Sequence, residues 1–188
     1  MAETTAQARF QQGMALQNMG LHEQAMAEYR QSIALQPDFL PALFQLGLLV
    51  RQLEQWQEAL SCFARCAMLA PGEPHVLAQR GELHFLLQDY AAALTDFDRV
   101  LELLAAGRAA PALNSADILF NRAAALENLG REAEALAAYD QLVALAPGNA
   151  KAWNNRGNLL LDARRLEESE QSYSRALALE PAHPAARA

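Results

Sequence analysis

The sequence predicts an all-α fold built from repeated helical hairpins, and three observations lead to this prediction. The 188 residues are 52% hydrophobic, much of this Ala and Leu, and Glu, Gln and Arg are also common; these are strong helix formers. Val and Ile, which favour strands, are scarce. Several kinds of residue recur every 34 positions. Such a period is typical of an array in which each helical hairpin buries its apolar faces against its neighbours.

The period is visible in four independent columns of residues. Pro37 and Pro71 lie 34 residues apart, as do Pro147 and Pro181, and the 76 residues between Pro71 and Pro147 leave room for two further periods and eight inserted residues. An aromatic column consists of Tyr29, Phe63, Phe97, Tyr139 and Tyr173. Two columns of small residues consist of Gly13, Gly47, Gly81, Ala123 and Gly157, and of Ala25, Ala59, Ala93, Ala135 and Ser169.

These columns divide most of the chain into five repeats, and each repeat is expected to form two helices. Two apolar stripes at helical spacing are separated by a short turn, such as Gly20-Leu21-His22. The proline ends the second helix, because the residue before proline is pushed out of the α region. The mid-helix glycine costs about 1 kcal/mol relative to Ala, which is acceptable where a neighbouring helix must approach closely. The repeats are residues 6–39, 40–73, 74–107, 116–149 and 150–183.

Residues 108–115 form an insertion between the third and fourth repeats. We expect helix-forming residues to lengthen the second helix of the third repeat until Gly107 and Pro111 end it. Asn114 or Ser115 is expected to cap the next helix. The insertion is either a surface bulge or a loop that makes a contact or changes the curvature of the array.

The chain continues past the fifth repeat with residues 184–188, the start of a truncated sixth repeat or a tail. A repeat array needs a polar cap, because the last hairpin otherwise exposes its stacking face. Three explanations stay open: further sequence beyond Ala188, pairing of the exposed face with a second copy, or an irregular end.

The pattern resembles the tetratricopeptide repeat, with a small residue at the eighth position, Ala at the twentieth, an aromatic residue at the twenty-fourth and Pro at the thirty-second. The resemblance implies a right-handed superhelical solenoid whose first helices line a concave groove for a protein or peptide partner. The sequence departs from the family in the fourth position, where only Trp153 is tryptophan. It also departs in the seventh position, where leucine is replaced by Gln12, Arg80, Arg122 and Arg156.

The resemblance also implies which residues face the groove. The sixth position is a carboxamide in all five repeats, and this amide column consists of Gln11, Gln45, Gln79, Asn121 and Asn155. It resembles the asparagine ladder of O-linked N-acetylglucosamine transferases, which implies hydrogen bonds to the backbone of an extended peptide. The other candidate peptide-binding residues are Phe10, Phe44, Phe120, Asn154 and Asn158. The phenylalanines either contact side chains of a partner or pack between hairpins.

Charge and composition exclude several other functions. The net charge of −7 disfavours nucleic-acid binding, and we expect neither a membrane span nor a secretory signal. Cys62 and Cys66 do not form a disulfide framework, which favours the cytoplasm. No phosphate loop or metal-binding motif is visible and the histidines are scattered, so we expect no cofactor, no metal and no enzymatic activity.

The sequence therefore favours an interaction scaffold that binds an extended peptide or partner segment in its concave groove. Two alternatives remain. The chain is the N-terminal substrate-recruiting repeat domain of a larger enzyme, such as a glycosyltransferase, or it is a structural module that self-assembles through its uncapped C-terminal end.

Overall fold

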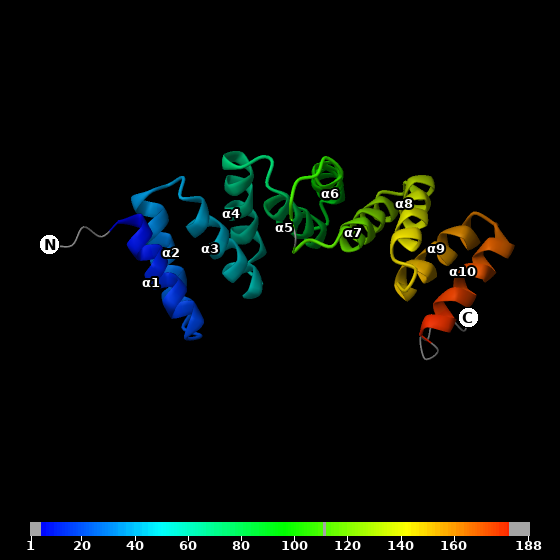
Figure 1. The fold of residues 1–188 in the computed structure, drawn as a ribbon, viewed down its shortest axis with the longest axis horizontal. Helices are drawn as coiled ribbons and strands as arrows, with labels where there is room; N and C mark the ends of the chain where they lie inside the picture. The colour runs from blue at the N-terminus through cyan, green and yellow to red at the C-terminus, as the bar shows by residue number, and fades with distance from the viewer. Residues whose placement is uncertain (1–4, 111, 181–188) are drawn as a thin grey trace. The chain divides into compact units, whose positions relative to one another are not determined.

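The computed structural model describes residues 5–110 and 112–180, and these residues form ten helices and no strand (Figure 1). Predictions that concern Pro111, Pro181 and residues 184–188 lie outside the described residues. The helices are α1 (Ala6–Asn18), α2 (His22–Leu35), α3 (Leu40–Gln52), α4 (Trp56–Leu69), α5 (Pro74–Leu86), α6 (Tyr90–Ala105), α7 (Ser115–Asn128), α8 (Glu132–Leu145), α9 (Ala150–Asp162) and α10 (Leu166–Leu179). The all-α prediction is confirmed.

The helices fall into two compact units, an N-terminal unit of Met1–Leu87 and a C-terminal unit of Gln88–Ala188. In the N-terminal unit, α1 packs on α2, α2 on α3, α3 on α4 and α4 on α5. In the C-terminal unit, each of the helices from α6 to α10 likewise packs on the next one in the chain. Contacts therefore run between sequence neighbours, as expected for a repeat array.

Close contact within a hairpin explains the glycines of the eighth position. A Cβ atom added to Gly13 would lie 2.6 Å from Cε1 of Tyr29, and one added to Gly157 would lie 2.7 Å from Cε1 of Tyr173. The aromatic ring of the second helix thus lies directly against the backbone of the first. Tyr29 is fully buried there. The predicted close approach of helices at these glycines is confirmed.

The turn inside each hairpin contains one residue with left-handed backbone geometry. Glycine adopts this geometry in two of the turns, but Glu54 has a φ of 59° and Arg164 a φ of 57°, which is strained for residues with a Cβ atom. The residues at this turn position are Gly20, Glu54, Gln88, Gly130 and Arg164.

The residues before the fourth repeat behave as predicted where the structure describes them. Helix α6 has 16 residues, whereas α4 and α8 each have 14. Gly107, with a φ of 82°, follows its end. Of the two predicted caps, the structure selects Asn114, whose Oδ1 accepts a hydrogen bond of 3.0 Å from the amide of Ala116, while Ser115 begins α7.

Ion pairs join successive repeats inside each unit. In the C-terminal unit, Arg122 Nε lies 2.5 Å from Asp98 Oδ1, and Arg156 Nε lies 2.6 Å from Asp140 Oδ1. Two arginines that replace leucine in the seventh position therefore have acidic partners on the preceding repeat.

The two cysteines are free thiols in the core of the N-terminal unit. Burial raises the pKa of Cys62 to about 11 and that of Cys66 to about 12. Both side chains therefore stay protonated at neutral pH and pack as small apolar groups.

Candidate functional site

The amide column lies on the first helix of each hairpin, as the sequence predicts. In the N-terminal unit, Gln11 is exposed on α1, while Gln45 on α3 and Gln79 on α5 are partly buried. In the C-terminal unit, Asn121 on α7 and Asn155 on α9 are also partly buried. Each amide is therefore accessible, and four of the five are partly enclosed by neighbouring side chains.

Gln79 belongs to a polar cluster with Arg51 and Glu82. One Nη atom of Arg51 donates to Oε1 of Gln79, and the other lies 2.5 Å from Oε2 of Glu82. The side chains of Arg51 and Glu82 are both 29% exposed. The cluster joins the last turn of α3 to the middle of α5.

Asn155 belongs to a second cluster, in the C-terminal unit, with Tyr139 and Glu127. The Tyr139 hydroxyl donates a 2.6 Å hydrogen bond to Glu127 Oε2 and accepts a 3.0 Å hydrogen bond from Nδ2 of Asn155. Burial raises the pKa of Tyr139, and the adjacent Glu127 raises it further. Burial also raises the pKa of Glu127, which the hydrogen bond from Tyr139 partly opposes.

The three candidate phenylalanines contact the aromatic residue of their own hairpin. The ring centroids of Phe44 and Phe63 are 5.6 Å apart in an edge-to-face arrangement, and those of Phe120 and Tyr139 are 6.1 Å apart. Phe10 lies 5.8 Å from Tyr29. All three phenylalanines are partly buried. They therefore pack within their hairpins and also present part of each ring to the surface.

Phe44 also lines a pocket of about 480 Å³ in the N-terminal unit, which we call the α3–α5 pocket. Pro41 and His75, which occupy the second position of their repeats, line it as well. Its lining is mainly apolar and includes one acidic residue, Glu73. The complete lining is Leu40, Pro41, Phe44, Glu73, His75 and Val76.

The two remaining candidates, on α9, differ in exposure. Asn158 is exposed, and its Oδ1 accepts a 2.7 Å hydrogen bond from the Tyr173 hydroxyl. Asn154 is only 8% exposed, and its Oδ1 is buried without a hydrogen-bond partner. The structure therefore places Asn154 in the packed interior of the hairpin, although the sequence reading placed it beside the amide column.

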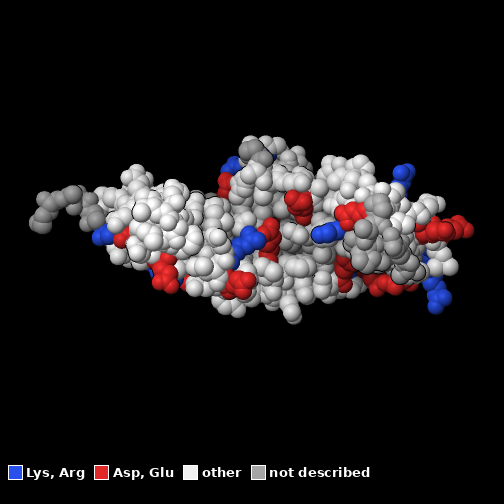
Figure 2. All heavy atoms as spheres, turned by 90° about the horizontal axis from the view of Figure 1, so that it is seen from below, with Lys and Arg blue, Asp and Glu red and all other residues white. Residues whose placement is uncertain are grey.

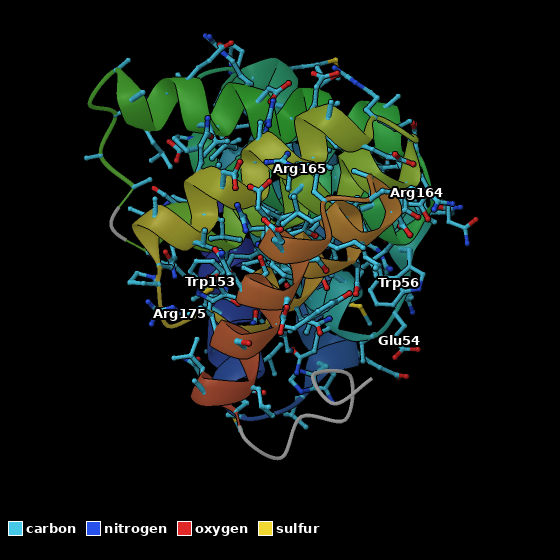
Figure 3. The ribbon with its side chains drawn as sticks, turned by 90° about the vertical axis from the view of Figure 1, so that its right-hand side faces the viewer. Glu54, Trp56, Trp153, Arg164, Arg165 and Arg175 are labelled. Carbon is cyan, nitrogen blue, oxygen red and sulfur yellow. The ribbon has the colours of Figure 1, made fainter. Side chains whose placement is uncertain are left out.

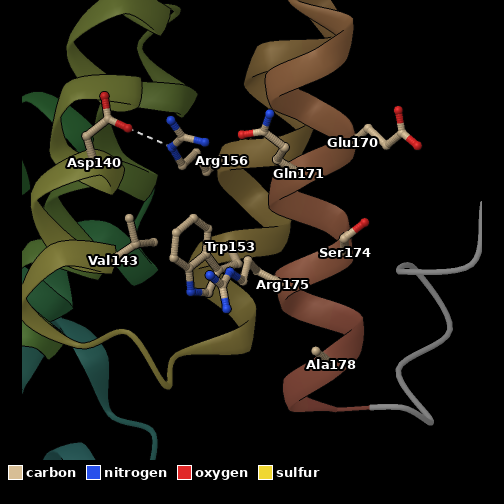
Figure 4. Close-up of a pocket in the computed structure, with 9 residues that line it drawn as sticks. All are labelled: Asp140, Val143, Trp153, Arg156, Glu170, Gln171, Ser174, Arg175 and Ala178. Atoms are coloured by element: carbon tan, nitrogen blue, oxygen red, sulfur yellow. Dashed lines mark hydrogen bonds and ion pairs between the residues drawn. The ribbon is translucent and has the colours of Figure 1, made fainter.

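A larger cavity, about 790 Å³, lies between α8, α9 and α10, and the sequence reading did not identify it (Figure 4). Trp153, Arg156 and Arg175 line it. Figure 3 shows Trp153 and Arg175 near one end of the α9–α10 hairpin, with Arg164 and Arg165 at its turn. Residues from three helices line the cavity, so no single column of the repeat predicts it.

Three polar side chains of this cavity, those of Trp153, Arg156 and Asp140, are already engaged in contacts within the chain. The indole N–H of Trp153 donates a 3.0 Å hydrogen bond to the Pro147 carbonyl, and the Arg156 guanidinium lies 5.9 Å from the Trp153 ring centroid. Arg156 also bonds to Asp140 and to the hydroxyl of Ser172. We place the candidate site at the amide column and the α3–α5 pocket, because the two helices that line this pocket also carry Gln45 and Gln79.

Sequence reasoning missed the part played by the aromatic column. Where this column contains tyrosine, its hydroxyl reaches a polar residue at the ninth or twelfth position of the same repeat. These pairs are Tyr29 with Gln17 at 2.6 Å, Tyr139 with Glu127 at 2.6 Å and Tyr173 with Asn158 at 2.7 Å. The sequence indicates these hydrogen bonds by the presence of Tyr rather than Phe at three positions of the aromatic column.

Other kinds of site find no support in the described part of the chain. Residues 5–110 and 112–180 contain no group of three His, Cys, Asp or Glu side chains placed to hold a metal ion. Basic and acidic side chains are interspersed on the face drawn in Figure 2. None of the described helices combines the length and apolar character needed to cross a membrane.

Comparison with known families agrees with this architecture. Family models described as tetratricopeptide repeat match residues 6–39, 116–149 and 150–183, which together make up more than half of the chain. The chain belongs to the tetratricopeptide-repeat family. Proteins of this family are typically interaction scaffolds without enzymatic activity of their own, and the fold supports that general role here.

One relative and several solved structures are similar to the chain. Human tetratricopeptide repeat protein 13 is 32% identical over 101 residues, which are 51% of this chain and 12% of that protein. The chain therefore spans a small part of that relative.

The crystal structure of YrrB, described as a TPR protein with an unusual peptide-binding site, has a TM-score of 0.86 at 21% identity and covers 99% of this chain and 92% of YrrB. A crystal structure of MamA has a TM-score of 0.80 at 18% identity and covers 90% of this chain and 94% of MamA. At these identities the two structures show a shared fold.

Proposed function

We propose that the chain is a protein-interaction scaffold that binds an extended peptide segment along its first helices. The amide column contacts the peptide backbone, and the phenylalanines beside it contact peptide side chains. The observation that carries this proposal is the α3–α5 pocket, where the partly buried Phe44 lines an apolar recess between the two helices that also carry the column amides Gln45 and Gln79.

The chemistry of the pocket indicates what kind of segment would bind. Pro41, Phe44 and Val76 offer apolar walls that accommodate an aliphatic or proline side chain. Glu73 also lines this pocket, and its negative charge would attract a basic residue next to that apolar side chain. An extended segment leaves its backbone groups free to bond with amides on neighbouring first helices. The structural similarity to YrrB, described as a TPR protein with an unusual peptide-binding site, supports a peptide ligand.

We also propose that the chain contains five repeats with the boundaries predicted from the sequence and that it is located in the cytoplasm. Peptide binding requires neither a cofactor nor catalysis. The net charge of −7 makes a nucleic-acid partner the less favourable one.

Peptide selection followed by affinity measurement tests the proposal. A random-sequence display library is panned on the wild-type chain, and the affinity of the best peptide is measured by fluorescence anisotropy. Gln45→Ala and Phe44→Ala should each weaken binding about tenfold, because each removes one desolvated contact. Gln57→Ala is the matched control, because Gln57 is an exposed glutamine on the second helix of the same hairpin.

The selected peptide gives a clear outcome either way. Weaker binding by Gln45→Ala and Phe44→Ala, with an unchanged Gln57→Ala, supports the proposed surface. If no peptide is selected, or if all three variants bind equally well, peptide binding at this surface is wrong.

Self-association is a second candidate function, because the last hairpin exposes large apolar side chains. Leu161, Leu166 and Leu179 are 48%, 61% and 42% exposed on α9 and α10. If these leucines pair two copies, sedimentation equilibrium should show a mass that rises with concentration, and Leu166→Asp should abolish the rise. A monomer mass at all concentrations would eliminate this candidate.

A further inference from the structure

We infer that neighbouring side chains fix which group two amides of the column present to a peptide. Gln79 presents its NH₂ group to a peptide carbonyl, and Asn155 presents its carbonyl oxygen to a peptide N–H. This inference rests on the proposed function and adds a direction to it, because it states which backbone group of the ligand meets each amide.

The orientation of Gln79 follows from the chemistry of Arg51. A guanidinium group has only hydrogen-bond donors, so the Gln79 atom that contacts Arg51 must be the acceptor Oε1. Arg51 is itself held by Glu82 at 2.5 Å, which keeps the guanidinium in place. A reversed Gln79 amide would place its NH₂ group against these donors. The two Nε2 protons of Gln79 are therefore available to a ligand.

The orientation of Asn155 follows from the chemistry of Glu127, which acts on Asn155 through the hydroxyl group of Tyr139. An ionised carboxylate only accepts hydrogen bonds, so the single hydroxyl proton of Tyr139 is committed to Glu127. The Tyr139 oxygen can then only accept, and Asn155 must turn its Nδ2 group toward it. The amide oxygen of Asn155, on the opposite side of the group, is left for a ligand.

The two clusters give opposite results for one physical reason. Arg51 is a fixed donor and holds an amide oxygen, whereas Tyr139 has been made a fixed acceptor by Glu127 and holds an amide NH₂ group. Within the described residues, Gln45 makes no side-chain hydrogen bond. Its amide is free to rotate and to present either group, so Gln45 serves as an internal control.

The Asn155 orientation can be tested without any ligand. In ¹H–¹⁵N spectra of the full chain, the Asn155 side-chain NH₂ resonances should shift upfield in Tyr139→Phe, because a hydrogen bond is lost. Phe63 and Phe97 occupy the same column, which shows that the column accepts phenylalanine. Tyr29→Phe is the control, because the Tyr29 hydroxyl contacts Gln17 and Met14 and reaches no amide of the column. Unchanged Asn155 resonances in Tyr139→Phe would overturn the inference.

The ligand-bound test uses the peptide selected on the wild-type chain and analogues in which one backbone amide at a time is replaced by an ester. An ester removes one N–H donor, so the analogue lacking the N–H opposite Asn155 should bind about fivefold more weakly, the worth of one hydrogen bond. This penalty should disappear in Asn155→Ala and shrink in Tyr139→Phe, where the hydroxyl that holds the Asn155 NH₂ group is removed and Asn155 is free to turn. Tyr29→Phe should keep the full penalty.

The outcomes separate this inference from the proposed function. If no peptide is selected, the proposed function fails, and the spectra still decide the orientation of the Asn155 amide. If peptide binds and Asn155→Ala weakens it, but every ester analogue keeps the same penalty in Tyr139→Phe, the fixed orientation is wrong although the binding surface is right.

Discussion

Arg156 Nε lies 2.6 Å from Asp140 Oδ1 and joins the first helix of the last hairpin to the second helix of the hairpin before it. Arg122 and Asp98 make the same contact one repeat earlier, at 2.5 Å. The two pairs are separated by 16 and 24 residues along the chain, and the difference equals the length of the insertion. The insertion therefore leaves this ion pair between successive repeats in place.

This ion pair should contribute measurably to stability. Asp140→Asn should lower the free energy of unfolding by about 1 kcal/mol, because the largely buried Arg156 loses its charged partner. Arg156→Leu restores the residue usual at this position. A double-mutant cycle measured by urea unfolding should give a coupling of about 0.5–1 kcal/mol. Glu170→Gln, on the exposed surface of α10, is the control; a zero coupling would contradict the contact.

Glu127 should make stability depend on pH. Its pKa is raised by burial in the folded chain, so the folded state binds the proton more tightly than the unfolded state. Its contribution to stability therefore decreases as pH rises from its ordinary pKa of 4.5 through the raised value.

Unfolding curves across this range should show the wild type gaining stability relative to Glu127→Gln as pH falls. Glu23→Gln, on the exposed surface of α2, should follow the wild type. Parallel curves for the wild type and Glu127→Gln would show that the carboxyl is not buried as described.

Asn154→Leu should stabilise the chain. The buried Oδ1 of Asn154 has no hydrogen-bond partner, and a buried polar atom without a partner costs about 1–3 kcal/mol. Leucine has the same number of side-chain heavy atoms with the same branching at Cγ and no polar atom, so the variant should gain about 1 kcal/mol in the free energy of unfolding. Gln171→Leu, at an exposed position, should be nearly neutral. A loss of stability in Asn154→Leu would mean that Asn154 makes a contact absent from this structure.

Glu54→Gly should also stabilise the chain, through the backbone. Glu54 has a φ of 59°, and this geometry costs a residue with a Cβ atom about 1–2 kcal/mol, part of which the greater chain entropy of glycine offsets. We expect a net gain of about 0.5–1 kcal/mol in thermal or urea unfolding. Glu54→Ala keeps the Cβ atom and should give no gain. Equal effects of the two substitutions would rule out backbone strain as the cause.

Gly157→Ala should destabilise the chain. The added methyl group would lie 2.7 Å from the ring of Tyr173, and overpacking of this kind costs about 1–3 kcal/mol, of which the better helix propensity of Ala returns about 1. Gly148→Ala is the matched control, because a Cβ atom there meets nothing within 4 Å. Equal stability of the two variants would show that the Tyr173 ring moves aside freely.

Much of the fold was predictable because it depends on periodic burial. The repeat columns predict where the described helices begin and end, as the turn at Gly20 and the lengthened α6 illustrate. The position of Asn154 was not predictable, because the fifth position lies at the boundary between groove and hairpin interior. Its burial depends on the distance between two helices, which one column of sequence does not record.

The candidate site was predictable as a set of residues, but not as a set of contacts. The amides and Phe44 could be read from their columns. The links from Arg51 to Gln79 and from Tyr139 to Asn155 join the twelfth or twenty-fourth position of one repeat to the sixth of the next. They depend on how far flexible side chains reach between repeats, which the period alone does not specify.

The most direct test of the central claim is to map where a selected peptide binds by chemical-shift perturbation. The account predicts that the largest shifts fall on the side-chain amides of the column and on residues of the α3–α5 pocket, including Gln45, Phe44 and Val76. Shifts confined to the second helices, or to the cavity around Trp153, would contradict it.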